Sequence, residues 1–322
     1  RPRLRTAFNA PQGYIADECP PNFEVYRTSR LRVFESLRPG PPIPLHPHSL
    51  LRFRRNVFSE CGEDGIVEAV LQSLGISQGF CFEFGAWDGI YASNCRYWIE
   101  QGWDALMVEA DPDKFLVLKR TYRNLPSVRV ENALVNASGP DSIQGLLERA
   151  GVEGPATLLS IDVDGMDYRL LQSLGGVPAE LRPLVVLVET NGFIRPDLAK
   201  VLDDSDSAGN LQQSLAVFQR LARSLGYRMV AFTQNAVLLR DDLADRLPPD
   251  MRGPESVNRL YLDALSVNWN DLLLNIGATR RGAPDALVAA EMEQFGEFAA
   301  EVDLVKLLER AEDEEAEERV GA

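Results

Sequence analysis

Acidic residues stand at the ends of apolar segments in this chain, at spacings that suit the binding of a nucleoside. Glu83 lies in the apolar segment Phe82–Phe84 and is followed at once by the glycine-punctuated turn of residues 85–89. A second apolar segment ends in Glu109. A glycine turn lets backbone approach a ligand, and a carboxylate after the next strand can accept both hydroxyl protons of a ribose. The pattern predicts a nucleoside-binding βαβ unit.

The glycine turn differs from the dinucleotide-binding pattern in a way that narrows the choice of ligand. It lacks the G-x-G-x-x-G spacing, and Glu83 would repel a pyrophosphate. The acid instead suits a ligand that carries a positive charge, such as S-adenosylmethionine (SAM). We expect Gly85 and Gly89 to let the backbone approach the methionine part of SAM. Glu83 or Asp88 could pair with the amino group of the ligand.

Polar residues also follow the second and third predicted strands. Glu109 is expected to contact the ribose, whereas Asp111 is expected to be a helix N-cap with Pro112 at the first helical position. After the next strand, Asn132 and Ala133 could meet the adenine edge. A turn asparagine is an equal alternative for Asn132.

Carboxylates crowd the end of the fourth predicted strand. Asp162, Asp164 and Asp167 lie close together there, and the next strand ends in Glu189, with Asn191 two positions on. Adjacent parallel strands are about 4.8 Å apart, so the two clusters should face one another. Asp162, Glu189 and Asn191 then offer hard oxygen ligands suited to Mg²⁺. Without a metal, Asp162 or Asp164 could orient a substrate hydroxyl or act as a general base, and Asp167 could cap a helix.

Composition and charge restrict the class of protein. The 322 residues carry a formal net charge of -15, which argues against a nucleic-acid binder. No apolar segment reaches the roughly 18 residues of a membrane span, and the N-terminus lacks the apolar core of a signal peptide. The cysteines form no C-x-x-C pair and Cys81 lies in an apolar strand, so we expect a buried thiol there and a reducing cytoplasm. His46 and His48 lie in a Pro-rich segment, as exposed loop residues or as a base brought over the pocket.

Strand and helix patterns alternate through the middle of the chain, which predicts an α/β fold with a doubly wound, mostly parallel sheet. The strands are near-continuous apolar runs, as expected for a sheet covered on both faces. We predict a helix from about 59 to 74, then strands at 80–84, 105–109, 128–131, 157–161 and 184–188, and helices at 93–101, 112–123, 141–150, 167–174 and 210–225.

The last two predicted strands must run antiparallel. Segments 227–232 and 236–240 are separated by only three residues, too few for a parallel crossover, so they form a hairpin. A parallel sheet closed by an antiparallel hairpin is the usual topology of class I, Rossmann-like SAM-dependent methyltransferases. It also disfavours a dehydrogenase, the first alternative enzyme class.

The chain divides into three predicted regions. Residues 1–58 form an irregular arm rich in Pro and Arg, residues 59–242 the methyltransferase domain, and residues 243–322 a helical C-terminal extension with an acidic tail. The C-terminal helices could pack on their own domain or form a homodimer. The arginines of the arm could bind an acidic substrate or the acidic body of the same chain; they are Arg27, Arg30, Arg32, Arg38, Arg52, Arg54 and Arg55.

These pieces together resemble the FkbM family of SAM-dependent methyltransferases. The resemblance covers roughly residues 57–242 and is carried by residues 59–65, 82–89, 93–94, 102–103, 108–111, 160–168 and 188–191, with the hairpin that starts at Gly226. It implies O-methylation of a hydroxyl, typically on a natural product or sugar, and a segment around Glu63 and Asp64 that packs near the cofactor. Related O-methyltransferases hold Mg²⁺ with an acid after the fourth strand and an acid/amide pair after the fifth, which Thr190 splits here.

The sequence therefore predicts a SAM-dependent O-methyltransferase that acts on a small-molecule hydroxyl, with SAM as the cofactor and Mg²⁺ as a candidate metal. A non-catalytic binding or scaffold protein that keeps the fold, and a methyltransferase for a carboxyl or peptide side chain, are the alternatives. The predicted catalytic residues are Asp162 and Asp164. The predicted cofactor contacts are Glu63, Asp64, Glu83, Gly85, Ala86, Asp88, Asn94, Glu109, Ala110, Asn132, Ala133 and Asp162.

Overall fold

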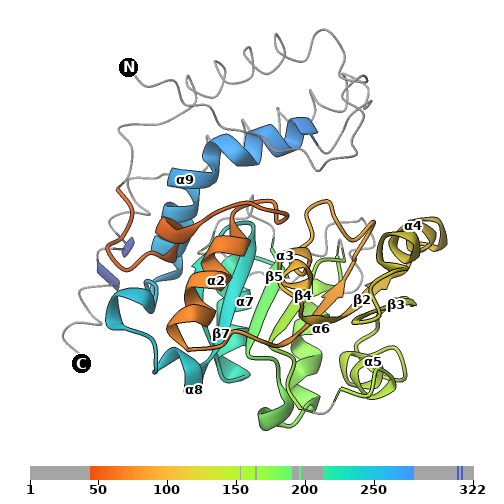
Figure 1. The fold of residues 1–322 in the computed structure, drawn as a ribbon. Coiled ribbons are helices and arrows are strands. Elements are labelled where there is room, and N and C mark those ends of the chain that lie inside the picture. Colours follow the sequence, from red (N-terminus) through yellow and green to blue (C-terminus); the bar gives the residue numbers. More distant parts are fainter. Residues whose placement is uncertain are drawn as a thin grey trace, which may run out of the picture.

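A seven-stranded sheet forms the centre of the computed structural model, which describes residues 44–152, 154–163, 165–190, 196, 213–278, 310–311 and 313–314. The strand order is β3-β2-β1-β4-β5-β7-β6. The strands are β1 (Phe80–Phe84), β2 (Asp104–Glu109), β3 (Val128–Asn132), β4 (Leu158–Ile161), β5 (Val185–Glu189), β6 (Tyr227–Phe232) and β7 (Asn235–Arg240). Figure 1 shows the strands at the centre, with α2, α7 and α8 near one end of the sheet and α4 and α5 near the other.

The pairing of the strands confirms the predicted topology. The first five strands are parallel to one another, whereas β7 runs antiparallel to both β5 and β6. Apart from the partly buried Phe80, the apolar side chains of β1, β4 and β5 are buried, which explains their near-continuous apolar sequences. The chain has the class I methyltransferase, Rossmann-like fold, in which ligands bind at the carboxyl edge of the parallel strands.

The helices follow the predicted alternation but several are shorter. They are α2 (Glu63–Ser73), α3 (Arg96–Glu100), α4 (Pro112–Tyr122), α5 (Ile143–Arg149), α6 (Asp167–Ser173), α7 (Leu215–Ser224), α8 (Asp241–Ala244) and α9 (Val257–Ala278). Short 3-10 turns lie at Leu50–Phe53, Leu174–Gly176, Ala179–Leu181 and Pro249–Met251. The first helix begins at Glu63 rather than near 59 because the Asp64 carboxylate accepts the backbone N–H groups of residues 57–59 and holds them in a turn.

The described end of the N-terminal arm packs against the body of the molecule. Leu50 and Leu51 are buried in the core. Arg52 forms an ion pair with Asp250, at 2.7 Å. Arg55 pairs with Glu68, also at 2.7 Å. Arg52 and Arg55 thus bind acids of the same chain, the second of the two predicted roles; the arginines from 27 to 38 lie outside the described residues.

Helix α9 contacts the sheet and also residues near both ends of the described chain. Arg259 and Asp263 form a buried pair on this helix, with Nε and Oδ1 at 3.0 Å. The Tyr261 ring stacks on Phe232 of β6. Near the C-terminus, the Glu314 carboxylate accepts the Asn258 side-chain amide at 2.9 Å. Among the described helices, none is both long and apolar enough to cross a membrane.

Candidate functional site

Glu83 holds the loop that leads from β1 to α3. Its carboxylate accepts the Ser93 hydroxyl at 2.6 Å and the Asn94 backbone N–H at 2.7 Å. The side chain is buried, and this burial raises the pKa of Glu83 to about 7, even though the hydrogen bonds favour its charged form. These bonds keep residues 93–95 out of a helix, so α3 starts at Arg96 rather than at 93.

Asn94 carries the loop across to the neighbouring strand. Its side-chain amide donates to the Ser160 hydroxyl of β4 at 3.0 Å. Among the described residues the amide oxygen of Asn94, which is buried, has no hydrogen-bond partner. The residue predicted as a cofactor contact therefore connects β1 to β4, and its role toward a cofactor stays a prediction, as it does for the other predicted contacts.

Gly85 lies in close contact with the backbone at the end of β4. Its φ is +70°, a region that favours glycine, and an added Cβ would lie 1.8 Å from the Asp162 carbonyl oxygen. The adjacent Ala86 donates its N–H to the Val108 carbonyl of β2, at 3.1 Å. The turn after β1 thus touches both neighbouring strands. The glycine is required by protein packing, a reason that the sequence did not reveal.

The Glu109 carboxylate lies at the carboxyl end of β2 and organises two turns. One oxygen accepts the Trp87 N–H and the other the Asp111 N–H, both at 2.8 Å. Each oxygen keeps a second lone pair for a ligand such as a ribose hydroxyl. Asp111 is confirmed as the N-cap of α4, since its side chain accepts the N–H groups of Asp113 and Lys114. These backbone hydrogen bonds lower the pKa of Asp111.

Asp88 and Gly89 serve the shape of the turn itself. The Asp88 carboxylate accepts the N–H groups of Ile90 and Tyr91, at 2.8 and 2.9 Å, and so closes its own turn. At Gly89 an added Cβ would lie 2.4 Å from the Tyr122 ring. Packing against α4 therefore gives Gly89 a role apart from any approach to methionine.

Asn132 ties the end of β3 to the end of β2. Its side-chain amide donates to the carbonyls of Glu109 and Ala110, at 2.7 and 3.0 Å. The Ala133 N–H also donates to the Glu109 carbonyl, at 3.2 Å. Both amide hydrogens of Asn132 are therefore directed to protein, which favours the alternative of a turn asparagine.

Glu63 and Asp64 fix the start of α2 instead of presenting open carboxylates. Glu63 is buried, and its carboxylate accepts the Thr233 hydroxyl, the Asn235 side-chain amide and the Cys61 N–H. Thr233 lies in the hairpin turn and Asn235 is the first residue of β7. The short gap predicted the hairpin, and the polar residues in it were the signal for these contacts. In Asp64, one oxygen accepts three backbone N–H groups, and burial raises the pKa of the carboxyl.

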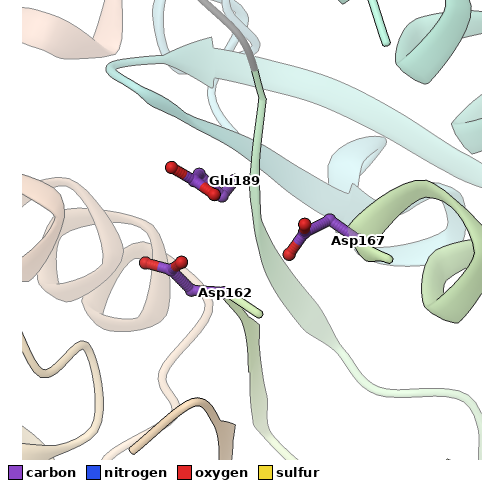
Figure 2. Close-up of side chains that lie close together, drawn as sticks. All are labelled: Asp162, Asp167 and Glu189. Carbon is purple, nitrogen blue, oxygen red and sulfur yellow. The ribbon is translucent and has the colours of Figure 1, made fainter. Parts of the chain in front are cut away.

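Three carboxylates converge at the ends of β4 and β5. Asp162, Asp167 and Glu189 each place an oxygen within 4.8 Å of the others, and Figure 2 shows the three side chains turned toward one another. The register of the strands places Asp162 beside Glu189, as the sequence predicted. Asp164 and Asn191, predicted as a catalytic residue and a metal ligand, lie outside the described residues.

Asp167 is the member of this cluster that sequence reasoning assigned wrongly. It is the first residue of α6 and does not cap the helix; the N-cap position belongs to Met166. The buried Asp167 carboxylate instead accepts the N–H groups of Val163 and Gly165, both at 2.9 Å. It curls the loop back so that the carboxylate joins Asp162 and Glu189. Three carboxylates so placed can hold a divalent cation or position and deprotonate a hydroxyl.

The two histidines lie beside α9. The backbone N–H of His46 donates to the Asp263 carboxylate at 3.0 Å, and the backbone N–H of His48 donates to Nδ1 of His46 at 3.2 Å. His48 is exposed, in agreement with the simpler of the two predicted roles. Cys81 and Cys95 are free, buried thiols, which confirms the expectation for Cys81, and Cys61 is buried as well.

Comparison with known proteins finds matches among solved structures but none by sequence family. No family model matches the chain, and no curated protein matches it. Among solved structures, a TehB-like SAM-dependent methyltransferase from Corynebacterium glutamicum is 12% identical over 69% of this chain and 100% of its own, with a TM-score of 0.33. A putative sarcosine dimethylglycine methyltransferase from Galdieria sulphuraria is 12% identical over 74% and 80%, with a TM-score of 0.39. The N-terminal domain of EvdMO1, solved with SAH bound, is 12% identical over 66% and 94%, with a TM-score of 0.35. The fold assignment itself rests on strand order and pairing.

Proposed function

We propose that this protein is a SAM-dependent methyltransferase that transfers the methyl group to a hydroxyl of a small molecule. The observation that carries the proposal is the place of Glu109. Its carboxylate lies at the carboxyl end of β2 and is bonded to the turn that follows β1, within a sheet of the methyltransferase order. A carboxylate there can accept both ribose hydroxyls of a nucleoside. The buried acid Glu83 before the glycine turn distinguishes the site from one built for a pyrophosphate.

The residues of β1 and β2 act mainly by holding the cofactor in a fixed position. Glu83, Asp88 and Glu109 each accept two backbone or side-chain donors of the turns around them. A turn held in this way keeps its shape before the ligand arrives. Such preorganisation lowers the entropic barrier, because methyl transfer needs the acceptor oxygen, the methyl carbon and the sulfur in line.

The acids of β4 and β5 act on the acceptor in this proposal. The acceptor oxygen attacks the methyl carbon, the carbon–sulfur bond breaks, and its electron pair stays on the sulfur. The hydroxyl proton passes to a carboxylate of the cluster and then to solvent. Asp162 suits this role because it lies beside Glu189 and because its carbonyl touches Gly85 of the cofactor turn. The base and the donor turn are thus adjacent.

The same cluster fits a divalent cation such as Mg²⁺, with Asp162, Asp167 and Glu189 as the protein ligands. Hard carboxylate oxygens within 4.8 Å of one another are the donor set that Mg²⁺ accepts. When bound, the cation supplies positive charge that favours the deprotonated acceptor. Asp162 and Glu189 were expected as ligands from the sequence, and Asp167 joins them. The expected ligand Asn191 lies outside the described residues and stays a prediction.

Calorimetry with S-adenosylhomocysteine (SAH), the demethylated cofactor, tests the first part of this proposal. The wild-type protein should bind SAH, and a folded Glu109→Ala variant should lose at least about tenfold in affinity. A folded wild-type sample that does not bind SAH, or a variant that binds it unchanged, contradicts the assignment.

Turnover tests the second part. The protein is incubated with SAM and a panel of sugars, phenols and polyketide alcohols, with carboxylic acids and peptides as a second panel. SAH release with a methyl ether in the product supports O-methylation of a hydroxyl, the activity that the FkbM resemblance also implies. Methyl esters or methylated peptides would move the acceptor to the second panel. Binding without any turnover would support a scaffold protein.

A further inference from the structure

Trp87 is held in an unusual conformation at the edge of the candidate cofactor site. It is one of two non-glycine residues with positive φ among the described residues, with a φ of 46°. A bulky residue in this region is a genuine outlier, and such strain persists where the surroundings enforce it. The indole is also 52% exposed, although most large apolar side chains of the fold are buried. Both features indicate a displayed side chain and not a packing element.

The backbone beneath the indole is fixed by its neighbours. The Trp87 N–H donates to Glu109, and Asp88 closes the following turn. The Thr121 hydroxyl of α4 donates to the Asp88 carbonyl at 2.8 Å. The Tyr122 hydroxyl donates to the Gly89 carbonyl. The ring is therefore presented from a turn that α4 and Glu109 hold on both sides.

A cation already lies on the face of this ring. The Lys114 ammonium is 3.6 Å from the centroid of the indole, well inside the range of a cation–π contact. Lys114 lies in the first turn of α4, next to the N-cap that follows Glu109. Its long, flexible side chain can leave the ring at little cost. The ring face thus shows a preference for positive charge at a place where a ligand can replace the lysine.

We propose that the indole face of Trp87 binds the sulfonium of SAM, which takes the place of the Lys114 ammonium. This inference rests on the proposed function. The sulfur of SAM is covalently bonded to the 5′ carbon of the ribose. Glu109, the acid expected to bind that ribose, accepts a hydrogen bond from the Trp87 backbone. The adenine is attached to the opposite side of the ribose and is neutral, so the cation on the ring favours the sulfonium.

This arrangement distinguishes the cofactor from its product. SAM and SAH differ by one methyl group and one positive charge. Only SAM can replace the lost Lys114 contact with a new cation–π contact. After methyl transfer the sulfur is neutral and makes no cation–π contact, so Lys114 competes with SAH for the ring face. Trp87 then favours binding of SAM and release of SAH.

The test compares the affinities of both ligands in three variants by calorimetry. Trp87→Leu keeps an unbranched Cβ that tolerates the same backbone, and Trp87→Phe keeps a weaker aromatic face. We expect Trp87→Leu to weaken SAM by about five- to thirtyfold and SAH by less than about twofold, with Trp87→Phe between wild type and Trp87→Leu for SAM. Lys114→Met removes the resident cation, which competes with both ligands, so it should change the two affinities by the same factor.

The results distinguish a failure of the sulfonium site from a failure of the proposed function. Equal loss of SAM and SAH in the folded Trp87 variants places the ring against a part that the two ligands share, such as adenine, and overturns the sulfonium site. Unchanged affinities for both ligands overturn it as well. A folded wild-type protein that binds neither ligand overturns the proposed function. If Trp87→Leu does not fold, the ratio of SAM to SAH affinity in Trp87→Phe decides alone.

Discussion

The carboxylates at the β1 and β2 ends and those at the β4 and β5 ends look alike in the sequence but differ in what they contact. The carboxylate oxygens of Glu83 and Glu109 accept hydrogen bonds from the turns around them. Asp162, Asp167 and Glu189 bring oxygens within 4.8 Å of one another, and in this group Asp167 also accepts two loop N–H groups. An acid at a strand end can therefore build a turn or contribute charge to a shared site. The first group shapes a place for the cofactor, and the second concentrates negative charge where the acceptor would lie.

Gly85 connects the two regions, and its substitution should have the largest effect. In Gly85→Ala the new Cβ would lie 1.8 Å from the Asp162 carbonyl oxygen, at a φ that already disfavours alanine. We expect the free energy of unfolding to fall by about 3–5 kcal/mol, measured by denaturant unfolding.

Gly102→Ala is the matched control for this substitution. Gly102 also has a positive φ, but nothing lies within 4 Å of its added Cβ. It should lose only about 1–2 kcal/mol, from conformation alone. Equal losses at the two positions would mean that the contact between the regions contributes nothing.

The pKa of Glu83 gives the next largest effect, in the β1 region alone. Burial raises the pKa to about 7 from 4.5, so the folded state binds the proton more tightly than the unfolded chain. This contribution to stability is complete below pH 4.5 and is lost as the pH rises through 7, by up to about 1.4 kcal/mol per pH unit. Unfolding titrations from pH 4.5 to 8 should show a smaller slope in Glu83→Gln.

Glu131→Gln is the control for the pH experiment, because Glu131 lies on β3 in a surface ion pair with Arg149. It should leave the slope of the wild-type protein in place. Glu60, whose pKa burial also raises to about 7, should maintain part of the slope in Glu83→Gln. A slope that is identical in Glu83→Gln and the wild type would show that Glu83 is ionised across the whole range.

Glu109→Gln separates turn building from ligand binding within the β2 region. The variant keeps the size of the side chain and one acceptor oxygen, but it loses the charge and leaves one of two backbone N–H groups without its acceptor. We expect stability to fall by about 1–2 kcal/mol and SAH affinity by about tenfold, measured by thermal unfolding and calorimetry. A stability loss without any change in affinity would limit Glu109 to the turn.

The smallest effect is expected where charges face one another. Asp162→Asn combined with Glu189→Gln removes two negative charges from adjacent strand ends. The free energy of unfolding without divalent cations should rise by about 0.5–1 kcal/mol. Any rise of the melting temperature that Mg²⁺ causes in the wild type should disappear in this variant.

Asp104→Asn combined with Glu180→Gln changes the net charge equally at two exposed positions and serves as the control. Its response to Mg²⁺ should match that of the wild type. A wild-type protein whose stability and turnover are the same in Mg²⁺ and in EDTA would leave the cluster with the role of a base alone.

The sequence was sufficient to predict the sheet and the sheet edge at which the acids lie, because both follow from regular patterns. Apolar strands, alternating helices and a three-residue gap between the last strands determine the topology. The sequence could not predict the individual contacts, because these depend on loops that fold back toward the sheet. Asp167 is placed at the cluster by hydrogen bonds that its carboxylate accepts from the backbone of Val163 and Gly165. Gly85 needs its small size because of β4, which no local pattern connects to it.

The bond between Glu63 and the hairpin turn has a consequence for how the chain assembles. Glu63 lies at the start of the first helix of the domain, and its partners are Thr233 in the hairpin turn and Asn235 at the start of β7. During synthesis, the helix emerges before these partners exist, so the carboxylate gains two of its three hydrogen bonds only when the hairpin is made. A chain released before residue 235 would lack both bonds, so the start of the first helix and the end of the sheet become fixed in one step.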